Sequence, residues 1–186
     1  MPRLSTLGVV ALAAWTSTGV QVRDIDGAWR RPFDPEGPAS VLVFVSRDCP
    51  VSNGYAPEIQ RTCAEFERKG VSCLLIYEDA AIEPAAVRAH LREYRYRGLP
   101  AVIDVGGALA ARTKATVTPS VAVVGADGAI RYRGRIDNKY VATGKAREAV
   151  TSHDLRDAVD AVVAGRPVSH PDTEAFGCYI SVRYPS

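Results

Sequence analysis

The pattern of apolar and polar positions divides the chain into predicted strands and helices. An uninterrupted apolar run at residues 41–45 and a mostly apolar run at 71–77 are typical of strands buried on both faces of a parallel or mixed sheet. Between them, apolar residues recur at helical spacing from Tyr55 to Phe66, and the pattern ends at Gly70. The pattern therefore predicts a strand–helix–strand unit, and such a crossover is right-handed as a rule.

The flanking segments extend this unit into a sandwich. Residues 20–33 form two runs around Asp26-Gly27, which predicts an N-terminal β-hairpin. The other predicted elements are a helix from Pro84, an extended segment at 101–105, a helical turn at 108–114, strands at 121–124 and 129–133, and a helix at 155–163. This order predicts an α/β three-layer sandwich, with a central mixed sheet and helices on both faces.

Composition limits the class of protein. The 186 residues are 47% hydrophobic and carry a net charge of +2, which suits one globular domain and offers no field strong enough to attract nucleic acid. No run approaches the roughly 18–20 apolar residues of a membrane-spanning helix. The four cysteines are far fewer than a disulfide scaffold needs.

We divide the chain into a leader at 1–19, a main domain at 20–166, and a C-terminal tail at 167–186 that carries Cys178. Arg3 and the short apolar run at 7–15 leave two alternatives for the leader, a signal segment or a plain extension. A periplasmic or secreted location is therefore as well supported as a cytoplasmic one, because four thiols fit either compartment.

The candidate chemistry lies where the first buried strand ends. Cys49 stands between this strand and the following helix, and catalytic groups of open α/β sheets collect at that edge. A helix N-terminus stabilises a thiolate through its unpaired N–H groups. Pro50 suits the first helical turn, and Ser52 could donate its hydroxyl to the sulfur. The sequence therefore predicts that Cys49 is a nucleophilic thiol of low pKa.

Several motifs together resemble one family. They are Cys49-Pro50 after VLVFVSRD, Thr118-Pro119 before a strand, the run 131–137 after a DG turn, and the tail segment 171–180. Over residues 20–182 the chain is similar to the redoxin branch of the thioredoxin superfamily, the alkyl hydroperoxide reductase/thiol-specific antioxidant-like proteins. The resemblance implies a thioredoxin-like fold, with Pro119 as a cis-proline that abuts the reactive thiol and shapes the substrate groove. Candidate substrate-binding residues are Pro50, Thr118 and Arg135.

The chain departs from two motifs of this superfamily. Thioredoxins use Cys-x-x-Cys, whereas Ser52 stands where the second cysteine would be. Peroxiredoxins use Pro-x-x-x-Thr/Ser-x-x-Cys, and here Ser46 supplies the hydroxyl position but Leu42 replaces the proline. A peroxidase would also need a guanidinium beside the sulfur. The candidates for that group are Arg112, Arg133 and Arg135.

The other cysteines differ in their fitness to resolve an oxidised Cys49. Cys63 lies 14 residues along the same helix, about 21 Å away, which is too far for a disulfide. Cys73 lies in a buried strand at a depth similar to Cys63, so the two are either core residues or a structural bridge. Cys178 lies in an irregular tail, and we favour it as the partner of Cys49.

We therefore predict a thiol-disulfide oxidoreductase of the redoxin type, with Cys49, Cys178, Ser46, Ser52 and Pro119 as its catalytic residues. The first alternative is a peroxiredoxin-like peroxidase. The second is a Cu(I)-binding metallochaperone, because thiolates prefer soft metals, although no histidine has metal-ligand spacing. No cofactor is expected. Expected partners are a disulfide protein or a small peroxide, and an external thiol reductant.

Overall fold

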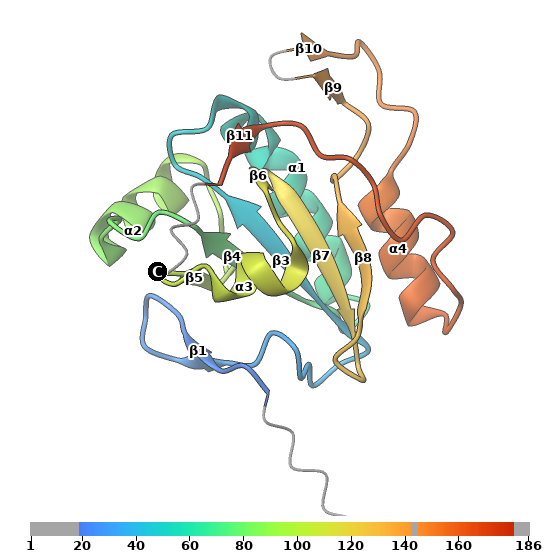
Figure 1. The fold of residues 1–186 in the computed structure, drawn as a ribbon, viewed down its shortest axis with the longest axis horizontal. Helices are drawn as coiled ribbons and strands as arrows, with labels where there is room; N and C mark the ends of the chain where they lie inside the picture. Colours follow the sequence, from blue (N-terminus) through green and yellow to red (C-terminus); the bar gives the residue numbers. More distant parts are fainter. Residues whose placement is uncertain (1–18, 143–144, 181–186) are drawn as a thin grey trace, which may run out of the picture.

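The computed structural model describes residues 19–142 and 145–180, and a mixed five-stranded sheet forms its centre (Figure 1). The strand order is β5-β4-β3-β7-β8. The strands are β3 (Ala39–Val45), β4 (Ser72–Tyr77), β5 (Ala101–Ile103), β7 (Ser120–Gly125) and β8 (Ile130–Gly134). β3, β4 and β5 are parallel, and β7 and β8 join antiparallel. The predicted mixed sheet is confirmed.

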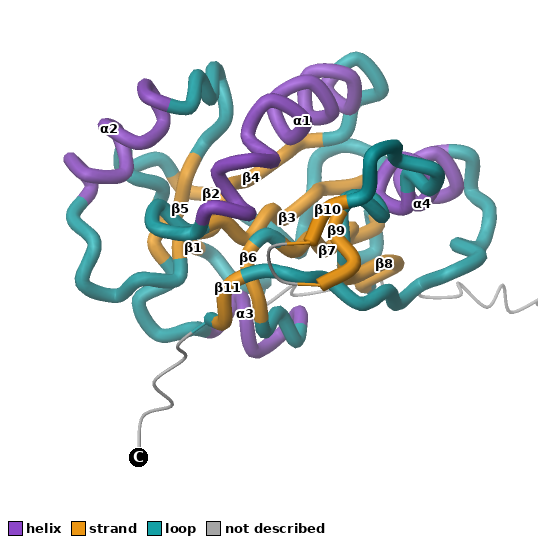
Figure 2. The backbone as a smooth tube through the Cα atoms, turned by 90° about the horizontal axis from the view of Figure 1, so that it is seen from above, coloured by secondary structure: helices purple, strands orange, loops and turns teal. Residues whose placement is uncertain are grey.

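Helices cover both faces of the sheet, as Figure 2 shows from above. They are α1 (Pro50–Glu67), α2 (Pro84–Glu93), α3 (Ala108–Thr113) and α4 (Asp154–Val163). Alternation along β3 creates two cores, since Val41 and Val43 pack with α1, α2 and α4, whereas Leu42 and Phe44 pack with α3. The predicted three-layer sandwich is therefore confirmed. None of the helices in the described part of the chain is long and apolar enough to cross a membrane.

The remaining strands are short pairs. They are β1 (Val22–Arg23) with β2 (Trp29–Arg30), β6 (Val117–Thr118) with β11 (Cys178–Tyr179), and β9 (Tyr140–Ala142) with β10 (Lys145–Ala146). The N-terminal hairpin is present but shorter than predicted, because the buried Asp24 carboxylate accepts the N–H groups of Asp26 and Ala28 and pairs with Arg30. The predicted leader lies outside the described residues, apart from residue 19.

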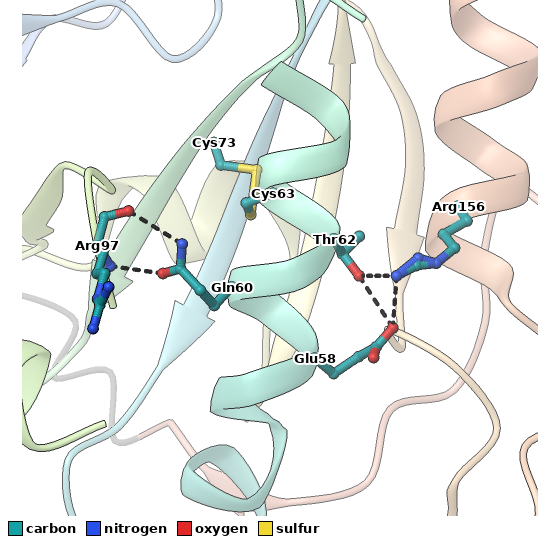
Figure 3. The surroundings of a disulfide bond; sticks show 7 residues. All are labelled: Glu58, Gln60, Thr62, Cys63, Cys73, Arg97 and Arg156. Atoms are coloured by element: carbon teal, nitrogen blue, oxygen red, sulfur yellow. Dashed lines mark hydrogen bonds and ion pairs between the residues drawn. A yellow bond between two sulfur atoms is a disulfide. The ribbon is translucent and has the colours of Figure 1, made fainter. Parts of the chain in front are cut away.

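A disulfide ties α1 to the sheet (Figure 3). It joins Cys63 of α1 to Cys73 of β4, with their Cα atoms 5.9 Å apart, so of the two alternatives for these residues the structure has the bridge. Two other contacts fix the same helix. Gln60 exchanges two hydrogen bonds with the backbone of Arg97, and Arg156 of α4 reaches the Glu58 carboxylate and the Thr62 hydroxyl. The helix that begins beside Cys49 is thus held on three sides.

Candidate active site

Cys49 lies between the carboxyl end of β3 and the first turn of α1 and is only 1% exposed. It is the N-cap residue of α1, and its sulfur accepts the backbone N–H of Ser52 at 3.4 Å. As a thiol it donates to the carbonyl oxygen of Thr118 at 3.2 Å. Pro50 is the first helical residue, as predicted. The sulfur thus occupies the place of a helix-capping oxygen, where negative charge is stabilised.

The two serines hold the loop that carries Cys49. The Ser52 hydroxyl accepts the backbone N–H of Ser46 at 3.2 Å, and the Ser46 carbonyl accepts the N–H of Cys49 at 3.4 Å. The expected hydrogen bond from the Ser52 hydroxyl to the sulfur is therefore replaced by one from its backbone N–H. The hydroxyl is instead engaged with the loop, because the tight turn before α1 brings the Ser46 N–H toward it.

Thr118 and Pro119 form the opposite wall of the site. The peptide bond between them is cis. Antiparallel pairing of β6 with β11 puts Cys178 directly opposite Thr118, next to Cys49. Gly177 permits this approach, since a Cβ there would lie 2.0 Å from the Thr118 carbonyl oxygen. The tail therefore presents Cys178 as part of a strand, rather than on an irregular segment.

The site shifts the pKa values of the two thiols in opposite directions. Burial opposes the ionisation of Cys49, but hydrogen bonds from the Cys178 thiol and from the N–H groups of Ser52 and Cys178 outweigh it and lower the pKa of Cys49. Burial, the hydrogen bond to Cys49 and the charge of Cys49 together raise the pKa of Cys178 to about 11. Cys49 is thus the more acidic of the two thiols, and Cys178 stays protonated and donates a hydrogen bond to it.

The arginines named from the sequence are engaged with other groups. Arg135 forms an ion pair with Asp154 at the start of α4, Arg133 pairs with Asp172, and the Arg112 guanidinium lies 3.8 Å from the centre of the Phe33 ring. The structure therefore pairs Arg135 with Asp154 and not with Cys49 or Cys178. Within the described residues, no group of three His, Cys, Asp or Glu side chains could hold a metal ion.

A hydrogen-bond network around the buried His90 holds the loop that leads to Cys49, and the sequence analysis did not predict it. The Asn53 amide donates to the Arg47 carbonyl oxygen at 2.7 Å, so its own oxygen accepts from His90 Nε2 at 2.9 Å. His90 Nδ1 then accepts from the Tyr77 hydroxyl at 2.7 Å. Burial lowers the pKa of His90, which is 2% exposed, and keeps it neutral. Its helical spacing from Val87 and Tyr94 is the signal that could have revealed this position.

Comparison with known proteins relates this chain to a family of thiol-dependent oxidoreductases. The sequence model of the AhpC/TSA family matches residues 18–133. No curated protein sequence is significantly similar to the chain.

Among solved structures, an uncharacterized conserved protein from Geobacillus kaustophilus is 25% identical, with a TM-score of 0.76 and 89% of each chain covered. A hypothetical protein from Sinorhizobium meliloti is 24% identical, with a TM-score of 0.72, over 89% of this chain and 92% of the other. A secreted Mycobacterium tuberculosis disulfide oxidoreductase, homologous to E. coli DsbE, is 21% identical, with a TM-score of 0.56, over 76% and 95%. These likenesses confirm the thioredoxin-like fold.

Proposed function

Since the chain belongs to the AhpC/TSA family of thiol-dependent oxidoreductases, we propose that it exchanges disulfides, with Cys49 as nucleophile and Cys178 as resolving cysteine. The observation that carries the proposal is the pairing of β11 with β6. It places Cys178 opposite Thr118, the same residue whose carbonyl oxygen contacts the Cys49 sulfur. Two free thiols thus face each other at a helix N-terminus without a Cys-x-x-Cys motif.

The first step uses the charge difference between the thiols. The Cys49 thiolate attacks one sulfur of a substrate disulfide, forms a mixed disulfide and expels the other substrate sulfur as a thiolate. Burial is the main cause of the high pKa of Cys178, and the hydrogen bond to Cys49 and the charge of Cys49 raise it further. The first step removes the negative charge of Cys49 and its capacity to accept that hydrogen bond. Cys178 therefore ionises more readily once Cys49 has reacted.

The second step closes the cycle on the protein. The Cys178 thiolate attacks the Cys49 sulfur, the Cys49–Cys178 disulfide forms, and the second substrate thiolate leaves. The substrate has gained two electrons and the protein dithiol has lost two. An external thiol reductant restores the dithiol, and in the reverse direction the same steps oxidise a substrate dithiol. The Thr118-Pro119 wall supports substrate binding beside the sulfur.

The surroundings of Cys49 favour a disulfide over a peroxide. Peroxide reduction relies on a guanidinium that stabilises the leaving oxygen. The three arginines considered for that task are paired with Asp154, Asp172 and the Phe33 ring, and Arg47 is paired with Asp48. A sulfur leaving group needs less help, because its charge is spread over a large atom and its thiol is the stronger acid.

The test compares two oxidants on the reduced protein. We expect one equivalent of bis(2-hydroxyethyl) disulfide to give a Cys49–Cys178 disulfide in a non-reducing peptide map, faster than the same reagent reacts with a free thiol of ordinary pKa. The Cys178→Ser variant should stop at the mixed disulfide on Cys49. A mixed disulfide on Cys178, or an unreacted Cys49, contradicts the proposal. Faster oxidation by hydrogen peroxide than by the disulfide would favour the peroxidase instead.

A further inference from the structure

A cavity of about 580 Å³ lies next to the segments that carry the two thiols, although neither Cys49 nor Cys178 lines it. The carboxyl ends of β3 and β4, the loop 104–107, Thr118 and the tail residues Tyr179 and Ile180 form its walls. Thr118 contacts Cys49, and Tyr179 directly follows Cys178, so immediate neighbours of both thiols belong to the lining. Its size is that of a small-molecule site.

One buried polar atom of this cavity, Glu78 Oε1, lacks a hydrogen-bond partner within the described part of the chain. The Thr118 hydroxyl is also buried in the cavity wall, but it faces Cys49 and lowers the pKa of that thiol. Since buried polar atoms are nearly always hydrogen-bonded, Glu78 indicates a group that awaits a ligand.

The charge of the cavity indicates what kind of ligand. Four acidic residues line it, namely Asp48, Glu78, Asp79 and Asp104, against the single cation Arg47. Asp48 already engages Arg47, and Asp104 accepts the backbone N–H groups of Leu109 and Ala110. Among the residues that the structure describes, Glu78 has no such partner. Burial first, and then the Asp104 charge, raise the pKa of Glu78 to about 8.

We propose that this cavity binds a positively charged group of the disulfide substrate, with Glu78 as the carboxylate that pairs with it. The inference rests on the proposed function, because the cation must lie beside a sulfur atom that Cys49 attacks. On binding, the Glu78 carboxyl releases its proton to solvent and accepts hydrogen bonds from the cation. The Thr118 hydroxyl provides a neutral oxygen between this pair and the reacting sulfur atoms.

Three disulfides of similar length and different charge test the proposal. They are cystamine, which is dicationic, bis(2-hydroxyethyl) disulfide, which is neutral, and 3,3′-dithiodipropionate, which is dianionic. For each, the rate of Cys49–Cys178 disulfide formation is divided by the rate with dithiothreitol, because leaving-group acidity alone favours cystamine. We expect a normalised preference for cystamine over the neutral disulfide of about tenfold, the size of one charge-assisted hydrogen bond, and discrimination against the dianion.

Glu78→Gln identifies the residue responsible, since it keeps the shape and removes the charge. We expect it to lose most of the tenfold preference, whereas Glu36→Gln, the same change at an exposed site before β3, retains it. Equal normalised rates for all three disulfides, or an unchanged preference in Glu78→Gln, would overturn the inference. A Cys49 that no disulfide oxidises would instead refute the proposed function.

Discussion

The four cysteines form two pairs that the fold treats in opposite ways. Cys63 and Cys73 join the C-terminal half of α1 to β4 in a disulfide inside the apolar core. Cys49 and Cys178 are free thiols at the edge of the sheet, joined by hydrogen bonds between a helix N-terminus and a tail strand. Residue type is the same, so position alone separates a structural bridge from a reactive dithiol.

The difference lies in what each sulfur can do with negative charge. Around the disulfide the polar contacts of α1 are made by other residues, such as the Arg156 contact to Glu58. Around Cys49, four hydrogen-bond donors converge on the sulfur: the Cys178 thiol, the Thr118 hydroxyl, and the N–H groups of Ser52 and Cys178. A thiolate is therefore stabilised at one pair, whereas the sulfur atoms of the other pair are joined as a disulfide and buried among apolar side chains.

The sharpest test of this comparison removes sulfur atoms from one pair at a time. We expect Cys49→Ser to lower the rate of disulfide exchange by at least roughly 10³-fold, because a hydroxyl is not ionised at neutral pH and is a poor nucleophile. The Cys63→Ala/Cys73→Ala double variant should retain activity within about twofold, measured at a temperature where it is folded. A comparable loss of activity in both variants would remove the functional distinction between the pairs.

The second test measures stability in place of activity. The Cys63–Cys73 bridge closes a loop with a sequence separation of 10, and loss of such a cross-link costs about 3 kcal/mol in the loop-entropy estimate. The Cys63→Ala/Cys73→Ala variant should therefore unfold roughly 10 °C lower in calorimetry. Cys178→Ser is the control, because it also removes a sulfur atom but leaves the bridge intact. Its unfolding temperature should lie much closer to that of the wild-type protein. Equal midpoints for both variants would mean that the bridge adds no stability.

Sequence patterns predicted the sheet and the location of Cys49 because both depend on local signals. Buried strands appear as apolar runs, and the Cys-Pro step marks the start of α1. The position of Cys178 could not be derived in this way. It depends on a two-residue strand pair that links segments 60 residues apart, from Thr118 to Cys178, and on a glycine that allows close approach.

Hydrogen-bonded networks of side chains likewise could not be predicted from the pattern of apolar and polar residues. The burial of His90 was not predicted, and it is possible because Tyr77 and Asn53 supply hydrogen bonds that satisfy both ring nitrogens. Glu78 belongs to no sequence motif, and it becomes a candidate binding residue only because it lines the cavity. Polar groups that depend on partners from distant segments have no signature in one sequence.

A third test weakens the dithiol without removal of a sulfur atom. Gly177→Ala places a methyl group against the Thr118 carbonyl oxygen, so β11 must move away from β6. We expect the second step, formation of the Cys49–Cys178 disulfide from the mixed disulfide, to slow about tenfold, because the attacking sulfur loses its alignment. Gly165→Ala is the control, since open space surrounds that position, which follows α4 and is not among the residues that line the cavity. An unchanged second step in Gly177→Ala would show that β11 does not position Cys178.

The smallest effect concerns the acidity of Cys49 itself. Because its pKa is lowered, the rate of alkylation by a small reagent such as iodoacetamide should reach its half-maximal value at a lower pH than for an ordinary thiol. The Cys178→Ala variant removes the thiol that donates to Cys49 but keeps the backbone N–H donors, so the midpoint should move to higher pH without loss of the site. In the Cys63→Ala/Cys73→Ala variant the midpoint should stay where it is in wild type, since neither residue is among the groups that shift the Cys49 pKa. A midpoint that ignores Cys178 but follows the disulfide would mean that rigidity of α1, and not the facing thiol, sets the reactivity of Cys49.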